Sequence, residues 1–171
     1  MKNIVVLISG SGSNLQAIID ACGRKQINGT LRAVFSNKAD AFGLERARLA
    51  GIPAHALAQS QFADREAFDR QLMHEIDAYA PDLVVLAGFL SVLGPSVIEA
   101  YPRRILNVHP ALIPSFCGPG MYGLRPHEAA LARGCKVTGA TVHFVNEECD
   151  GGPILLQKAV DILPGDTPEV L

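Results

Sequence analysis

The stretch IVVLISGSGSN, residues 4–14, decides the fold class of this 171-residue chain. Its first five residues are all apolar, which is typical of a strand buried on both faces of a parallel sheet. Glycines at positions 10 and 12 then form a turn, and residues 15–21 carry apolar side chains at helical spacing. The stretch therefore predicts a strand, a glycine-rich turn and a helix in direct succession.

Further strands and helices alternate along the first hundred residues. We expect strands over residues 31–35, 53–56 and 83–87, and helices over residues 41–50, 64–79 and 95–101. This alternation indicates right-handed βαβ units, and hence a mostly parallel sheet with helices on both sides. The predicted fold is α/β, with three layers, a mostly parallel twisted sheet and a Rossmann-like N-terminal half.

The pattern changes near residue 100. We expect a strand over 104–109, a loop rich in Pro and Gly over 110–124, a helix over 127–133 and strands over 138–145 and 154–162. The chain is thus predicted to have two halves, residues 1–100 and 101–171, that share one sheet.

Composition narrows the classes of partner. The formal net charge of −2 disfavours a nucleic-acid partner. No apolar run approaches the about 20 residues of a membrane span, so we expect no membrane partner, and we expect no signal peptide. The four cysteines lie far apart without metal-binding spacing, so we expect free thiols, a cytoplasmic location and no bound metal.

The glycine-rich turn is a candidate phosphate site, because backbone N–H groups at a helix N-terminus attract anions. It does not match the dinucleotide fingerprint G-x-G-x-x-G, since Leu15 stands where the third glycine is needed. Ser36 and Asn37 follow the second strand, where a nicotinamide site would have an acid for the ribose. A single phosphate fits the turn, and a plain tight turn is the alternative.

Asn107 and His109 lie two residues apart at the end of a predicted strand, so their side chains project from the same face. An amide beside an imidazole can stabilise an oxyanion and move a proton, as acyl transfer to an amine requires. Asp150, in the turn before Gly151, could orient the imidazole and stabilise its cationic form. The alternatives are a strand-end histidine satisfied by the backbone and an aspartate that only forms a turn.

The other histidines are weaker candidates for a catalytic role. His55 and His74 are expected at the periphery, and His127 at the start of a helix. His143 lies inside a predicted strand, where packing explains it.

Several motifs together resemble a known family. They are, in chain order, VVLISGSGSNL (residues 5–15), FSN (35–37), LAGF (86–89), NVHPALIP (107–114) and DGGP (150–153). The set is similar to the folate-dependent formyltransferases and covers essentially the whole chain. The N-x-H-P motif and the later aspartate are shared by folate enzymes that transfer or hydrolyse a formyl group. The opening motif points to the members that formylate glycinamide ribonucleotide in purine synthesis.

The resemblance implies a formyltransferase fold and a role for each motif. Gly12, Ser13 and Asn14 would bind the phosphate of the ribonucleotide. Asn107 and His109 would surround the formyl carbonyl while the substrate amine attacks the formyl carbon, with Asp150 tuning His109. The donor, 10-formyltetrahydrofolate, would be contacted by Arg65, Leu90, Ser91, Val92, Leu93, Asn107, Asn146, Glu147, Glu148, Cys149 and Asp150. Residues 1–100 would then be the phosphate-binding half and residues 101–171 the catalytic and folate-binding half.

Two departures and two alternatives accompany this resemblance. The loop over residues 115–124 is longer than the common form of the family, and family members usually continue past the position of Leu171 into a helix that helps hold the ribonucleotide. One alternative is a formyltetrahydrofolate deformylase, in which water replaces the amine. Such enzymes usually carry an additional N-terminal domain, which we do not expect here. The other alternative is a nucleotide-binding module without catalysis.

Overall fold

The computed structural model describes residues 1–171, and its contacts divide them into two units, Met1–Ile105 and Leu106–Leu171. The strands are hydrogen-bonded in the order β3-β2-β1-β4-β5-β6-β7. The sheet is mostly parallel and carries helices, which confirms the predicted α/β fold.

Four parallel strands form the sheet of the first unit. They are β1 (Lys2–Ile8), β2 (Gly29–Ser36), β3 (Ala54–Ala56) and β4 (Leu83–Leu86). β1 pairs with β2 on one side and β4 on the other, and β3 pairs with β2. The predicted βαβ succession is therefore confirmed.

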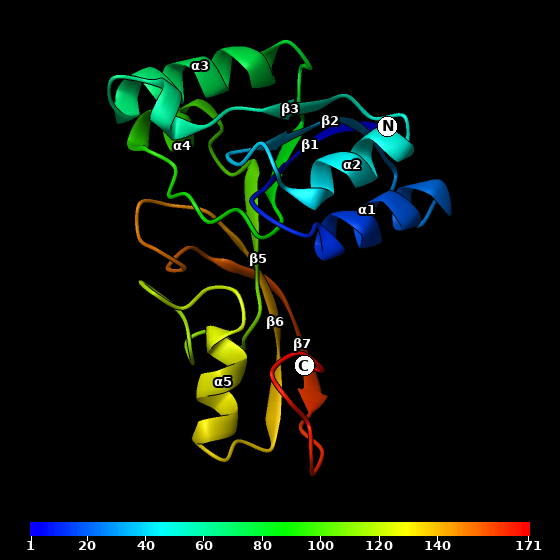
Figure 1. Ribbon diagram of the computed structural model, residues 1–171, viewed down its shortest axis with the longest axis vertical. Helices are drawn as coiled ribbons and strands as arrows, with labels where there is room; N and C mark the ends of the chain where they lie inside the picture. The colour runs from blue at the N-terminus through cyan, green and yellow to red at the C-terminus, as the bar shows by residue number, and fades with distance from the viewer. The chain divides into compact units, whose positions relative to one another are not determined.

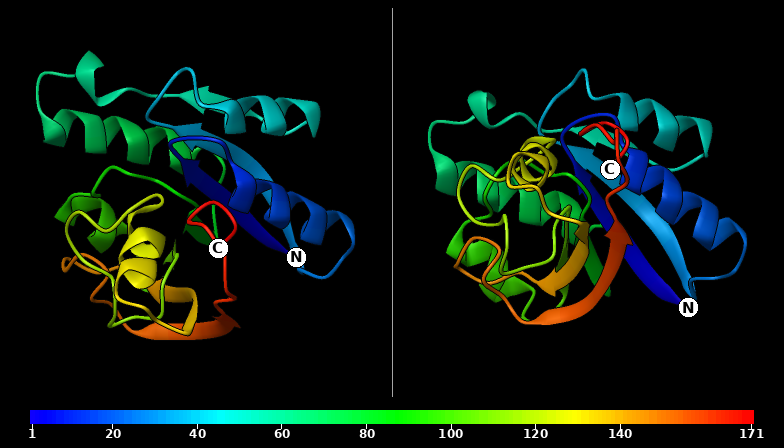
Figure 2. Two further views of the ribbon diagram at one scale, coloured as in Figure 1. Left: turned by 60° about the horizontal axis from the view of Figure 1, so that its bottom comes forward. Right: turned by 90° about the horizontal axis from the view of Figure 1, so that it is seen from below.

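Helices cover both faces of these four strands (Figures 1 and 2). α1 (Ser13–Gly23) and α2 (Phe42–Leu49) lie on one face, and α3 (Arg65–Asp77) and α4 (Pro95–Ala100) lie on the other. A short 3-10 turn, η1 (Gln59–Gln61), was not predicted.

β1 is buried on both faces, as its unbroken apolar run predicts. The side chains from Val5 to Ile8 have no exposed surface. Ile4, Val6 and Ile8 belong to the core cluster that contains Leu15 of α1 and Leu44 of α2. Each such buried aliphatic side chain contributes about 1.5–3 kcal/mol to folding. This burial fixes the C-terminal end of β1, and with it the glycine-rich turn.

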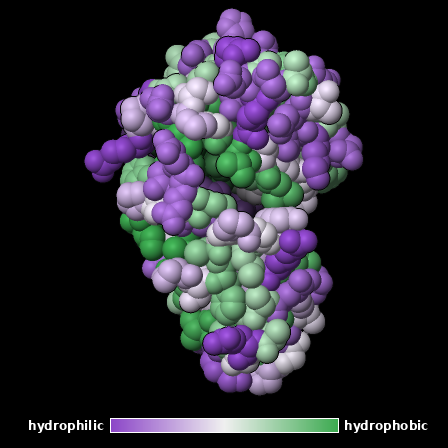
Figure 3. Space-filling model, turned by 90° about the vertical axis from the view of Figure 1, so that its left-hand side faces the viewer, coloured by the Kyte–Doolittle hydropathy of each residue, from purple (hydrophilic) through white to green (hydrophobic).

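The sequence of α3 explains why this segment is an amphipathic helix. Asp64 caps its N-terminus by accepting a hydrogen bond from the backbone N–H of Ala67 at 2.7 Å. Phe68, Leu72 and Ile76 follow at helical spacing and are buried. The opposite face is hydrophilic, and Figure 3 shows hydrophilic side chains covering the surface at the level of α3.

The second unit is an antiparallel arrangement of β5 (Ile105–His109), β6 (Val137–Phe144) and β7 (Ile154–Asp161), with one helix, α5 (Arg125–Ala132). β6 pairs with β5 and with β7 in antiparallel register. The register places Asn107 opposite His143 and His109 opposite Thr141. These strands match the predicted ranges to within one residue, and α5 begins two residues earlier than predicted because Pro126 fits its first turn.

All four cysteines are free, as expected. No helix combines the length and the apolar character that a membrane crossing needs.

Candidate active site

The glycine-rich turn connects β1 to α1 and is open to solvent at Ser13 and Asn14. Gly12 stands at the N-cap of α1 with φ 72°, and no side chain caps the helix. The first N–H groups of α1 are therefore free of a side-chain acceptor and can bind an anion. Arg46 of α2 adds a positive charge here, because its Nε atom donates to the Ser11 carbonyl oxygen at 2.8 Å. Nothing in the local sequence of the turn predicted Arg46.

Close packing explains why this turn needs glycine. A Cβ atom on Gly12 would lie 2.6 Å from the Cα atom of Gly43, and the positive φ also disfavours other residues. Gly43 in turn donates its N–H to the Gly10 carbonyl oxygen at 3.0 Å. The start of α2 thus supports the turn directly.

A buried serine links the turn to the segment after β4. The Ser9 hydroxyl donates to Oδ1 of Asn37 at 2.6 Å and accepts the N–H of Leu90 at 2.8 Å. Because Ser9 is 3 % exposed, these bonds are shielded from water. They hold the ends of β1 and β2 and the segment that begins at Leu90 in one arrangement.

Arg65 lies at the first position of α3 and contacts the same segment. Its Nε atom donates to Oδ1 of Asp69 at 3.0 Å, and its Nη1 atom donates to Oγ of Ser91 at 3.4 Å. Its Nη2 atom is buried and has no hydrogen-bond partner. Because a buried N–H without an acceptor costs free energy, this donor is suited to an anionic or carbonyl ligand. Among the predicted folate contacts, Leu90 and Val92 are exposed and Leu93 is buried.

In the second unit, Asn107 and His109 of β5 lie close to Asp150 of the loop between β6 and β7. The Asn107 Nδ2 atom donates to Oδ1 of Asp150 at 3.2 Å. The His109 Nδ1 atom lies 3.5 Å from Oδ2 of the same carboxylate. The structure therefore brings together the three residues that the sequence proposed for catalysis.

The backbone of the loop fixes the position of Asp150. Asp150 itself has φ 55°, and the N–H of Gly118 donates to its Oδ2 atom at 2.9 Å. Gly152, two residues later, lies so close to the Phe144 carbonyl oxygen that a Cβ atom would overlap with it. Gly152 of the DGGP motif is thus needed for close backbone packing next to the carboxylate.

The Asp150 carboxylate is ionised, although its side chain is only 9 % exposed. Burial acts to raise the pKa of Asp150, but the hydrogen bond that a protonated His143 donates, the N–H of Gly118 and the charges of His109 and His143 outweigh it and lower the pKa overall. The carboxylate can therefore stabilise an imidazolium at His143.

His143 is a site residue that the sequence analysis assigned to packing alone. It is 2 % exposed, and its Nε2 atom lies 3.1 Å from Nδ2 of Asn107 and 3.5 Å from Oδ1 of Asp150. Burial acts to lower the pKa of His143, but Asp150 and the Phe144 carbonyl oxygen raise it overall. The packing interpretation is therefore incomplete, because a cross-strand pairing that the sequence does not reveal places this histidine in the cluster.

The imidazole of His109 makes contacts on both ring nitrogens. Its Nε2 atom lies 2.8 Å from the Phe116 carbonyl oxygen, and that oxygen can only accept, so Nε2 carries the hydrogen. Phe116 has φ 50° in the long loop after β5. In this conformation a substrate oxygen would have to replace the Phe116 carbonyl to receive the Nε2 hydrogen.

His127 is also buried near this cluster. Its Nδ1 atom has no hydrogen-bond partner. Burial, and then the charge of His109, lower the pKa of His127. As predicted, it belongs to the first turn of a helix. Of the two histidines expected at the periphery, His74 is exposed and His55 is half-buried with its Nε2 atom 2.6 Å from the Tyr79 hydroxyl.

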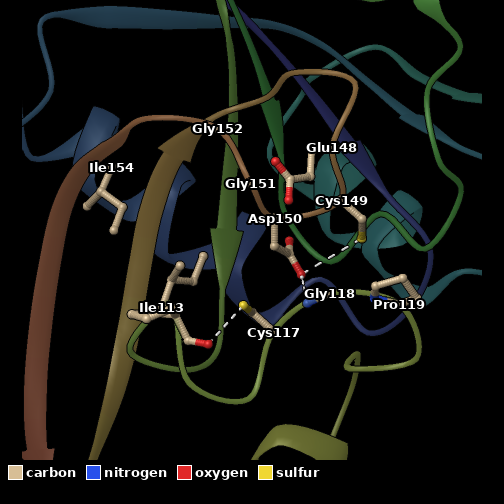
Figure 4. Close-up of a pocket in the computed structure, with 11 residues that line it drawn as sticks. Ile113, Cys117, Gly118, Pro119, Glu148, Cys149, Asp150, Gly151, Gly152 and Ile154 are labelled. Carbon is tan, nitrogen blue, oxygen red and sulfur yellow. Dashed lines mark hydrogen bonds between the residues drawn. The ribbon is translucent and has the colours of Figure 1, made fainter.

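A cavity of about 680 Å³ adjoins the Asp150 carboxylate (Figure 4). Two loops form much of its wall, the one after β5 and the one between β6 and β7. The residues that line it are Ile113, Pro114, Cys117, Gly118, Pro119, Glu148, Cys149, Asp150, Gly151, Gly152 and Ile154. The cavity thus includes three of the residues predicted to contact the folate, together with part of the unusually long loop.

Comparisons with known proteins agree with this geometry. Residues 2–171 match the family model described as formyl transferase. The chain is 58 % identical over 167 residues to a phosphoribosylglycinamide formyltransferase of Escherichia coli, covering 98 % of this chain and 76 % of that protein.

Solved structures give the same result. A glycinamide ribonucleotide transformylase from Symbiobacterium toebii superposes with a TM-score of 0.92 at 48 % identity, covering 99 % of this chain and 78 % of that one. A formyltetrahydrofolate deformylase from Pseudomonas syringae superposes with a TM-score of 0.86 at 26 % identity, covering 99 % and 54 %. This chain belongs to the formyl transferase family.

Proposed function

We propose that this protein transfers the formyl group of 10-formyltetrahydrofolate to the amine of glycinamide ribonucleotide, a step of purine synthesis. The observation that carries the proposal is the contact of the Asp150 carboxylate with Asn107 and with the imidazole of His109. The similarity to enzymes named for this reaction supports the choice of acceptor. Both substrates are small molecules, and we place the reaction in the cytoplasm.

The chemistry requires stabilisation of one oxyanion and movement of one proton. The amine nitrogen attacks the formyl carbon, the carbonyl electrons move to its oxygen, and collapse of this intermediate breaks the bond to the folate nitrogen. The proton lost by the amine goes to that leaving nitrogen. Asn107 and His109 carry N–H groups suited to the oxyanion, and the Asp150 carboxylate holds the orientation of the His109 ring.

Both of these donors are engaged within the protein. The Asn107 amide nitrogen contacts Asp150 and His143, and His109 Nε2 contacts the Phe116 carbonyl oxygen. The formyl oxygen must therefore replace at least one of these partners. A carbonyl oxygen that becomes an anion is a stronger acceptor than the neutral Phe116 carbonyl, so the exchange favours the transition state.

The folate has carboxylates and a planar ring, and the residues assigned to it include groups that suit each of these parts. The unpaired Nη2 atom of Arg65 fits a carboxylate, and exposed Leu90 and Val92 offer apolar surface. Residues 148–150 line the cavity, and the segment 146–150 would close over the pterin. Residues 1–100 would accordingly hold the ribonucleotide phosphate, and residues 101–171 the catalytic groups.

A deformylase is the main rival, and the second substrate distinguishes it. We expect consumption of 10-formyltetrahydrofolate to slow by at least about tenfold when glycinamide ribonucleotide is left out, because an amine bound through its phosphate gains rate from orientation that free water lacks. Folate absorbance and formate release measure the two reactions. Equal formate production with and without the ribonucleotide would establish the deformylase instead.

The glycine-rich turn makes a separate prediction about substrate affinity. Asn14→Ala should raise the KM for glycinamide ribonucleotide by about tenfold and leave the KM for the folate nearly unchanged, since the N-terminus of α1 is suited to phosphate. Asn28→Ala, in an exposed loop, is the matched control. Equal increases in both KM values would exclude the phosphate role. Ribonucleotide binding without any formyl transfer would instead favour a nucleotide-binding module.

A further inference from the structure

His143 faces Asn107 directly across the β5–β6 ladder. Directly opposed residues of antiparallel strands present their side chains on the same face, close enough to interact. The separation of 3.1 Å between His143 Nε2 and Asn107 Nδ2 is a hydrogen-bond distance. Because His143 is 2 % exposed, water cannot readily replace it as a partner of the amide.

The backbone determines which ring nitrogen of His143 carries the hydrogen. Nδ1 lies 3.0 Å from the Phe144 carbonyl oxygen, which can only accept a hydrogen bond. Nδ1 is therefore protonated in the neutral ring, and Nε2 has a lone pair. An amide N–H is the partner that this lone pair requires, so Asn107 must direct its nitrogen, not its oxygen, at His143.

Asp150 imposes the same orientation on the amide from another element. Its Oδ1 atom accepts the Asn107 amide nitrogen at 3.2 Å. If the Asn107 amide were flipped, its oxygen would face a carboxylate oxygen of Asp150 and the Nε2 lone pair of His143. All three are acceptors, so neither contact could be a hydrogen bond. The two N–H groups of one amide thus have two fixed acceptors, on β6 and on the β6–β7 loop.

We propose that His143 is a positioning residue whose Nε2 atom accepts one N–H of Asn107 and thereby holds the donor end of that amide beside Asp150. Asp150 lines the cavity, so the N–H groups are kept where a formyl oxygen can take one over. Because His143 is buried and Asp150 lines the cavity, the N–H that faces Asp150 is the one that the formyl oxygen takes over, and the bond to His143 stays in place in the transition state. This inference rests on the proposed formyl transfer, in which Asn107 is a donor to the oxyanion.

Protonation of His143 opposes this arrangement, because an Nε2–H would face the Asn107 N–H. The titratable groups around the ring and its carboxylate partner are Asp150 and, beyond it, His109 of β5. Cys117, Glu148 and Cys149 line the cavity together with Asp150. The orientation of Asn107 is therefore best defined when the His143 ring is neutral, at a pH above its raised pKa.

The first test needs no substrate. NMR of the whole protein with ¹⁵N-labelled histidine at about pH 9, where imidazoles with an ordinary pKa of about 6.5 are neutral, reports the tautomer of His143. The His143→Gln spectrum provides the assignment. We expect the Nδ1–H tautomer, and an Nε2–H tautomer would overturn the proposal whatever the protein's activity.

The second test is a double-mutant cycle on turnover. His143→Leu, which removes the acceptor, should lower kcat on the order of tenfold with both KM values nearly unchanged, and His143→Gln, which keeps an acceptor oxygen, should recover most of the loss. In an Asn107→Ala protein, His143→Leu should have little further effect, because its target is gone. Val142→Ala, on the same strand, is the control for general disturbance of β6.

The outcomes separate a positioning role from a structural one. If the effects of His143→Leu and Asn107→Ala on kcat multiply, or if Val142→Ala is as harmful as His143→Leu, His143 does not act through Asn107. Circular dichroism and thermal unfolding establish that each variant is folded before its kcat is compared. If the wild-type protein transfers no formyl group, the proposed function fails, and the tautomer measurement still stands as an independent result.

Discussion

Replacement of His109 by alanine is expected to lower kcat by at least about a hundredfold while the protein stays folded. His109 supplies an N–H at Nε2 and faces the Asp150 carboxylate at Nδ1, so its loss removes an oxyanion donor and a group that can move a proton. Asn107 would remain as an oxyanion donor, and we therefore expect residual activity above the uncatalysed rate. The measurement is steady-state formyl transfer with both substrates varied.

The controls for this prediction separate chemistry from folding. His74→Ala removes an exposed imidazole on α3 and should leave kcat unchanged. Because His109 is 3 % exposed, its truncation also leaves a cavity, and His109→Asn, which keeps a polar side chain, tests whether packing alone is responsible. Near-normal turnover in a folded His109→Ala protein would remove this residue from the mechanism and leave the family's chemistry to other groups.

The fold was predictable because its local signals are strong. The apolar run of β1, followed by Gly10 and Gly12, specifies a buried parallel strand and a turn at a helix start. Asn107 and His109 were predictable because a strand places residues two apart on the same face. Asp150 was a candidate only in combination with His109 and through the family resemblance, because its turn alone predicts no more than a turn former, and its position beside β5 depends on contacts across the loops.

The contacts that complete the site depend on pairing between distant segments. His143 joins the cluster because the antiparallel register sets it opposite Asn107, and a one-residue shift would direct it to the other face. Phe116 meets His109 because the loop after β5 folds back with Phe116 in a left-handed conformation. Arg46 reaches the Ser11 carbonyl because Gly12 and Gly43 allow α1 and α2 to approach closely. Neither register nor such close approach is specified by a local pattern of hydrophobicity.

Asp150→Asn should also lower kcat by at least about a hundredfold, and it should destabilise the fold by about 1–3 kcal/mol. The carboxylate faces His109 Nδ1 and accepts from Asn107 and Gly118, whereas an asparagine has one oxygen and one donor nitrogen. Whichever way the new amide turns, a donor meets a donor at a position that is only 9 % exposed. The loss of charge also removes the stabilisation of a protonated imidazole.

The pH dependence of the destabilisation caused by Asp150→Asn provides the most specific test of this prediction. Asp150 has a lowered pKa in the folded protein, so its contribution to stability is present above the ordinary Asp pKa of about 3.9 and is lost as pH falls through the folded pKa. His143 has a raised pKa, so its contribution is complete below the ordinary His pKa of about 6.5 and is lost as pH rises through the folded pKa. The stability difference between wild type and Asp150→Asn should therefore be greatest between about pH 4 and 6.5 and smaller at about pH 9.

Urea unfolding at several pH values measures this stability difference, with Asp161→Asn on exposed β7 as the matched charge control. A difference that is flat across this range, or equal for the two variants, would show that the Asp150 carboxylate does not interact with a charged imidazole in the folded protein.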